Sequence, residues 1–146
     1  MNKPVLVLDT NVVLDLLHFD DATARPLRHA LEDGRVRCVV SDATLEEWRR
    51  VLAYPEFALD SMQRAARLAR YQGLSETVAG LVADMVPLPR CSDPDDQKFI
   101  ELAAAAHAQG LVSKDRAVLR LRRRCAPYFR IMTPAEAVRW LDDLPV

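Results

Sequence analysis

The feature that most constrains the fold is a short apolar run near the N-terminus that ends in a carboxylate. Residues 5–8 are all aliphatic, and Asp9 follows them directly. An apolar run without polar alternation is typical of a strand buried on both faces of a parallel sheet. In open α/β sheets, ligands bind beyond the carboxyl ends of the strands, so Asp9 lies where a site is expected.

The rest of the chain alternates between strand-like apolar runs and amphipathic helical segments. Strands are predicted over 5–8, 36–40, 85–88, 111–113 and 128–131. Helices are predicted over 10–19, 23–33, 42–52, 59–71, 75–84, 95–108, 116–123 and 133–141. Thr23 and Thr133 are the predicted caps of the second and last helices, and Gly73 is the predicted stop after 59–71.

This alternation calls for a sheet covered by helices on both faces. We therefore expect an α/β fold, a three-layer α/β/α sandwich around a central, mainly parallel sheet of about five strands. The length of 146 residues suits one domain over 1–146.

Composition narrows the setting of the protein. The formal charge of −1 gives no global attraction to nucleic acid, so such attraction would need local clustering. The three cysteines are scattered, which argues for a reducing cytoplasm and against a disulfide frame or zinc site. No apolar run approaches the length of a membrane span. We expect a cytoplasmic protein without a membrane partner.

Several acids stand at positions that could form one site. Asp9 and Asp115 each follow a predicted strand. Glu47 lies on the flank of the apolar face of the 42–52 helix, whereas Glu46 points further toward solvent. On the later helix, residues 95 and 96 are both aspartates near the core face, and periodicity does not separate them.

Converging carboxylates repel one another unless they are protonated or bridged by a cation. Oxygen ligands alone suit a hard cation such as Mg²⁺ or Mn²⁺. Such a cation can activate water for attack on a phosphodiester. The alternative for each acid taken alone is a helix cap, a turn or a solvated helix face, since Asp is common at N-caps.

Four segments of the chain resemble the motifs of the PIN domain family, and within it the VapC-like ribonuclease toxins. The segments are 7–12 (VLDTNV), 41–52 (SDATLEEWRRVL), 91–99 (CSDPDDQKF) and 111–115 (LVSKD). The resemblance selects Glu47 in the second motif and Asp96 in the third. It spans residues 5 to about 135.

The resemblance implies a metal-dependent endoribonuclease whose Mg²⁺ or Mn²⁺ is held by Asp9, Glu47, Asp96 and Asp115. It also implies an RNA substrate, inhibition by a cognate antitoxin protein and a possible homodimer. Three polar residues close to the motif acids are interpreted as capping or supporting residues: Asn11, Ser41 and Ser113.

A basic tract begins beside the fourth motif. Between residues 114 and 130 the only acid is Asp115. Lys114, Arg116, Arg120 and Arg123 are candidates for RNA phosphate contacts, and a solvated charged face is the alternative interpretation.

Two residues keep other functions open. Many relatives carry a further acid at the place of Ala117, so the sequence leaves open whether one or two metal ions bind. The alternative function is that of a site-degenerate PIN domain, which binds RNA or protein without cleaving RNA. A haloacid-dehalogenase-like phosphatase also opens with a strand ending in Asp. That family needs a second Asp two residues later, where this chain has Asn11.

Overall fold

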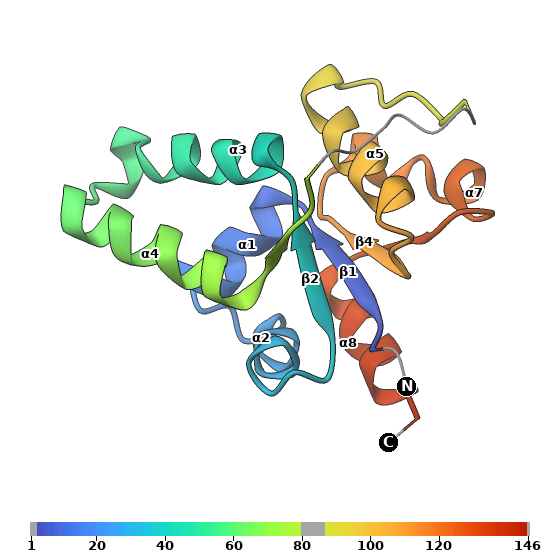
Figure 1. The fold of residues 1–146 in the computed structure, drawn as a ribbon, viewed down its shortest axis with the longest axis horizontal. Helices are drawn as coiled ribbons and strands as arrows, with labels where there is room; N and C mark the ends of the chain where they lie inside the picture. The colour runs from blue at the N-terminus through green and yellow to red at the C-terminus, as the bar shows by residue number, and fades with distance from the viewer. Residues whose placement is uncertain (1–2, 80–86, 146) are drawn as a thin grey trace.

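The computed structural model describes residues 3–79 and 87–145 and contains a five-stranded sheet in which every pairing is parallel (Figure 1). The strand order is β3-β2-β1-β4-β5. The strands are β1 (Val5–Leu8), β2 (Arg37–Val40), β3 (Glu76–Thr77), β4 (Gly110–Val112) and β5 (Arg130–Met132).

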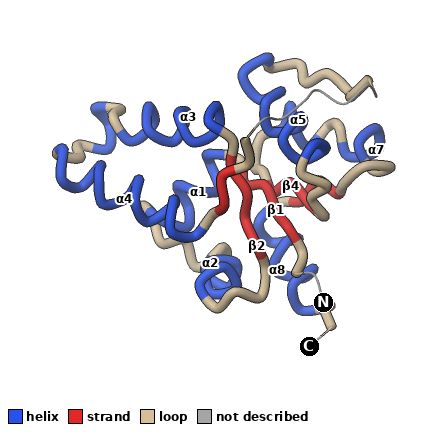
Figure 2. Tube along the Cα trace, viewed as in Figure 1, coloured by secondary structure: helices blue, strands red, loops and turns tan. Residues whose placement is uncertain are grey.

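Helices connect these strands and cover both faces of the sheet (Figure 2). The α-helices are α1 (Thr10–Leu17), α2 (Arg25–Glu32), α3 (Asp42–Leu52), α4 (Ser61–Leu74), α5 (Gln97–Ala105), α6 (Arg116–Leu119), α7 (Arg122–Cys125) and α8 (Pro134–Asp142). Two 3₁₀ turns, η1 (Pro55–Phe57) and η2 (Pro94–Asp96), precede α4 and α5. The predicted three-layer α/β sandwich is confirmed.

Two hydrophobic cores form because successive strand side chains point to opposite faces. In β1, Leu6 and Leu8 belong to the core under α1, α2 and α8, whereas Val7 belongs to the core under α5. A strand buried in this way on both faces has no polar alternation, which explains the uninterrupted apolar run.

Helices α3 and α4 pack against each other and extend away from the sheet (Figure 1). Trp48 of α3 is fully buried and meets Tyr71 of α4 edge to face, with ring centroids 6.0 Å apart. This aromatic contact fixes the direction of α3, the helix that carries Glu47.

The third strand is not where the sequence predicted it. Residues 76–77, predicted as helix, form β3, in which Glu76 and Thr77 pair with Val39 and Val40 of β2. Residues 80–84 of that predicted helix and residues 85–86 of the strand predicted over 85–88 lie outside the described residues, and 87–88 are not a strand. β3 is a short, exposed edge strand, so it lacks the apolar pattern used to recognise strands.

Several predicted helix ends were also wrong. Gly73 does not stop α4, which continues to Leu74, because a glycine costs a helix only about 1 kcal/mol. Thr23 does not cap α2; its backbone N–H instead binds the carboxylate of Asp21. Residues 95–96 belong to η2, the predicted 116–123 helix is two short helices, and the last strand is Arg130–Met132.

The topology brings the ends of the central strands to one edge. β1 lies between β2 and β4, and the chain passes over one face to reach β2 and over the other face to reach β4. A crevice between strands whose connections leave in opposite directions is the usual ligand position in such sheets. Asp9 follows β1 and Asp115 lies just beyond β4, so both acids border this point.

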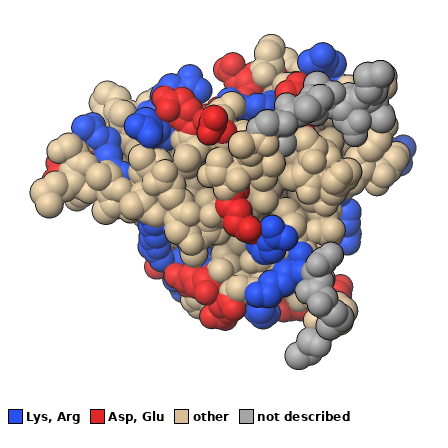
Figure 3. All heavy atoms as spheres, in the orientation of Figure 1, with Lys and Arg blue, Asp and Glu red and all other residues tan. Residues whose placement is uncertain are grey.

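Charged side chains of both signs are interspersed on the face shown in Figure 3, with wide uncharged areas between them. This distribution agrees with the near-zero formal charge. Among the residues that the structure describes, no helix combines the length and apolar character that a membrane span requires.

Candidate metal centre

Three of the predicted acids meet at the carboxyl edge of the sheet. Asp9, Asp96 and Asp115 each place a carboxylate oxygen within 4.8 Å of the other two. We call these residues the acidic triad. They come from the end of β1, from η2 and from the β4–α6 connection, so the packing of α5 on the sheet brings them together.

Asp9 is held in place by its neighbours. The Ser113 hydroxyl donates to Asp9 Oδ2 at 2.7 Å, and the amide of Asn11 donates to the same oxygen at 3.4 Å. Asp9 occupies the N-cap position of α1, but its side chain makes no capping hydrogen bond. Its carboxylate is therefore aimed at the other acids rather than at the helix.

Ser113 links two members of the triad. Besides donating to Asp9, its hydroxyl accepts from the backbone N–H of Asp115 at 3.0 Å. Asn11 tightens the same connection, since its side-chain oxygen accepts from the N–H of Lys114 at 3.3 Å. Asp115 itself caps α6 by accepting from the N–H of Ala117 at 2.8 Å. The predicted supporting residues Asn11 and Ser113 thus both contact the site.

Asp96 is the triad acid with an unsatisfied carboxylate oxygen among the described residues. It is only 8% exposed, and its Oδ2 is buried without a hydrogen-bond partner among the described residues. It stands at the N-cap of α5 without capping it. A buried acceptor without a partner is costly, so a ligand for this oxygen is expected.

The environment raises the pKa of two triad carboxyls. Burial is the main cause for Asp96, followed by a hydrogen bond with Asp115 that favours the protonated form, and together with nearby negative charges these raise its pKa to about 8. Burial also raises the pKa of Asp9 to about 6, against the opposing effect of the Ser113 hydrogen bond. A divalent cation would reverse this preference by favouring the charged carboxylates. The oxygen donors present fit Mg²⁺ or Mn²⁺.

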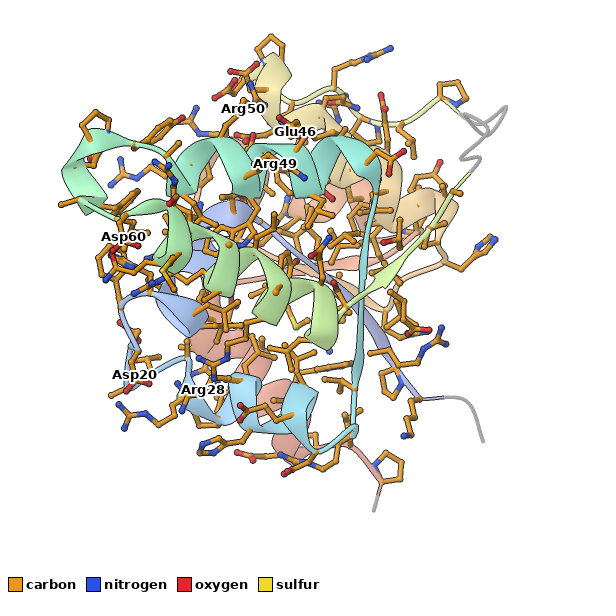
Figure 4. The ribbon with its side chains drawn as sticks, turned by 60° about the vertical axis from the view of Figure 1, so that its left-hand side comes forward. Asp20, Arg28, Glu46, Arg49, Arg50 and Asp60 are labelled. Atoms are coloured by element: carbon orange, nitrogen blue, oxygen red, sulfur yellow. The ribbon has the colours of Figure 1, made fainter. Side chains whose placement is uncertain are left out.

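Glu47 lies beside the triad but is not one of its members. One oxygen, Oε1, pairs with Lys98 Nζ at 2.6 Å, and the other accepts from the Thr10 hydroxyl. Glu46 lies on the outside of α3 and pairs with Arg49 (Figure 4). The distinction between Glu47 and Glu46 drawn from helical periodicity agrees with these positions.

Ser41 has a different role from the other supporting residues. Its hydroxyl accepts from the N–H of Thr44 at 3.2 Å, and the Thr44 hydroxyl accepts from the N–H of Ser41 at 2.9 Å. This capping box begins α3 and so acts on Glu47 through the helix.

The candidate RNA-contact residues lie in two settings. The Lys114 ammonium pairs with the buried Asp15 of α1 at 2.8 Å. The other three candidates, Arg116, Arg120 and Arg123, have exposed side chains on or beside α6 and α7.

Sequence reasoning missed the partners of the charged groups, namely Thr10, Asp15 and Lys98. Thr10 follows Asp9 directly, which is the one local signal that placed it near the site. The Lys98–Glu47 and Lys114–Asp15 pairs join separate elements, so no spacing along the chain indicates them.

Comparisons with known proteins agree with this architecture. A model of the PIN domain family matches residues 5–117. A solved structure, that of VapBC2 from Rickettsia felis bound to a DNA fragment from its promoter, has a similar fold with a TM-score of 0.59 at 13% identity. The match covers 88% of this chain and 98% of that chain. No curated protein sequence gives a significant match.

The parallel sheet and the acids at its carboxyl edge define a PIN-like α/β sandwich. The chain belongs to the PIN domain family. This membership removes the support for a haloacid-dehalogenase-like phosphatase, and Asn11, where that family needs an acid, instead orients Asp9.

Proposed function

We propose that the protein is a divalent-cation-dependent endoribonuclease that acts as the toxin of a bacterial toxin–antitoxin pair in the cytoplasm. PIN domains are generally nucleases, and this chain carries three clustered acids. The observation that carries the proposal is the convergence of these three acids, one of which, Asp96, has a buried oxygen without a partner among the described residues. A bound cation would offset the repulsion between these buried carboxylates.

In this proposal Asp9, Asp96 and Asp115 hold one Mg²⁺ or Mn²⁺. When bound, the cation supplies an activated water and offsets charge on the phosphodiester. Ser113 and Asn11 keep Asp9 oriented by donating to its Oδ2. Arg116, Arg120 and Arg123 contact RNA phosphates, which supplies affinity without sequence selectivity.

A matched set of variants tests this function. D9N and D96N should lose RNA cleavage, because each removes a charged oxygen ligand. D95N should keep it, because the Asp95 side chain is exposed and outside the triad. The measurement is cleavage of a labelled RNA with Mn²⁺ and with EDTA. Full activity of D9N in Mn²⁺ would refute the assignment.

The same measurement distinguishes a second candidate function, a PIN domain that only binds RNA or protein. Ala117 favours this candidate, because it leaves one acid fewer at the site. RNA binding by the wild-type protein with neither Mn²⁺ binding nor cleavage would establish it.

We also propose a cognate antitoxin as partner and a homodimer as the assembled form. The solved structure of similar fold is a VapBC complex on promoter DNA, which supports the antitoxin. The homodimer is proposed because members of the family often form dimers.

A further inference from the structure

We propose that the site binds a single divalent cation and that Lys98 supplies a fixed positive charge that keeps Glu47 out of the metal coordination. Lys98 is then a positioning residue of the site. The inference rests on the proposed metal-dependent function and concerns its cation number.

Both carboxylate oxygens of Glu47 are already engaged. Lys98 Nζ lies 2.6 Å from Oε1, and the Thr10 hydroxyl donates to Oε2. The side chains of Lys98 and Glu47 are only 21% and 17% exposed, so water screens their attraction less than at an open surface. A metal that binds Glu47 would have to compete with the lysine for the negative charge of this carboxylate, whereas the triad acids have no lysine or arginine partner among the described residues.

Lys98 is itself anchored from more than one side. Its ammonium donates to the main-chain carbonyl of Asp95 at 2.8 Å, and it lies 5.6 Å from the centre of the Phe99 ring. The accepting carbonyl lies in η2, directly before Asp96, and Lys98 lies in the first turn of α5. This hydrogen bond therefore links the two elements next to Asp96. These contacts hold the Lys98 ammonium group in one position, next to Glu47.

The triad and Glu47 thus divide into two charge groups. Among the residues that the structure describes, the triad has a buried oxygen without a partner, on Asp96, which a ligand could satisfy. Glu47 has its counter-charge within the protein. Position 117, where many relatives carry an acid, is alanine here and its N–H donates to Asp115, so Glu47 is the acid beside the triad that a second metal would draw on.

Titration of metal-stripped full-length protein with Mn²⁺ by calorimetry tests the inference. Wild type should bind one Mn²⁺ per chain, and K98R, which keeps the charge, should do the same. K98M should bind a second, weaker Mn²⁺ because Glu47 is released. The double variant K98M/E47Q should return to one.

Two outcomes would overturn the inference: two Mn²⁺ per wild-type chain, or a single Mn²⁺ per chain in folded K98M. The wild-type titration decides even if K98M does not fold. Two Mn²⁺ with RNA cleavage would overturn the single-cation site alone. No Mn²⁺ and no cleavage by wild type would overturn the proposed function as well.

Discussion

Each acid of the triad occupies a helix N-cap position, but only one of them uses its side chain for capping. Asp115 accepts from the N–H of Ala117, whereas the carboxylates of Asp9 and Asp96 make no capping bond. Helix capping explains why aspartate suits these backbone positions but not why two carboxylates turn toward each other. Their mutual repulsion is offset if a cation lies between them.

The raised pKa of Asp96 predicts a pH-dependent stability of the metal-free protein. The folded-state pKa of about 8 exceeds the ordinary value of 3.8, so the folded state binds this proton more tightly. The resulting stabilisation is fully present below about pH 4 and is lost as the pH rises toward 8. D96N has no such proton, so its free energy of unfolding should rise relative to wild type between pH 5 and 8.

Urea unfolding of both proteins in EDTA at several pH values measures this difference. Parallel curves for the two proteins would contradict the raised pKa of Asp96. Mn²⁺ should reverse the trend in wild type, since the cation binds the charged carboxylates and competes with protons.

At the scale of elements, the helices with reciprocal caps have the best-defined starts. Capping boxes begin α3 at Ser41, α4 at Asp60 and α8 at Thr133. Each satisfies backbone N–H groups that the helix itself leaves without acceptors. The first of these boxes fixes the start of the helix that carries Glu47, so a local motif contributes to the geometry of the site.

The cap of α8 gives a prediction with a matched control. Thr133 Oγ1 accepts from the N–H of Glu136 at 3.2 Å, so T133A should lower the free energy of unfolding by about 1 kcal/mol. T23A should change it little, because Thr23 is exposed and does not cap α2. Urea midpoints report both values. Equal losses in the two variants would show that the α8 cap contributes nothing specific.

At the scale of the whole molecule, the triad follows the carboxyl ends of β1 and β4. Helices α3 and α4 extend away from the sheet (Figure 1). The triad lies outside α3 and α4, so a substitution in the triad leaves the exposed surfaces of these two helices unchanged.

We predict that the wild-type chain arrests growth when expressed alone and that, if the adjacent reading frame encodes a small protein, that protein relieves the arrest. D9N should be harmless yet still co-purify with that protein, because the substitution removes a charge without altering the fold. Growth curves and affinity co-purification measure the two effects. Normal growth during accumulation of folded wild-type protein would contradict the toxin proposal.

The sequence alone determined the features that depend on neighbouring residues. The apolar runs of β1 and β2 and the caps at Ser41 and Thr133 are local signals, and each was predicted correctly in kind. The α/β/α sandwich followed from the alternation of these segments. The position of Asp9 at the carboxyl edge of the sheet also followed from the sequence, because the residue directly after a buried parallel strand lies at that edge.

Only the tertiary structure decided the features that join distant segments. β3 is a strand because β2 offers it backbone partners, not because its polar residues favour one. The pairing of Lys98 with Glu47 exists because α5 lies close to α3, and hydrophobic periodicity specifies no ion pairs. Spacing along the chain did not separate Asp95 from Asp96, whereas burial distinguishes them, since Asp96 points into the triad and Asp95 into solvent.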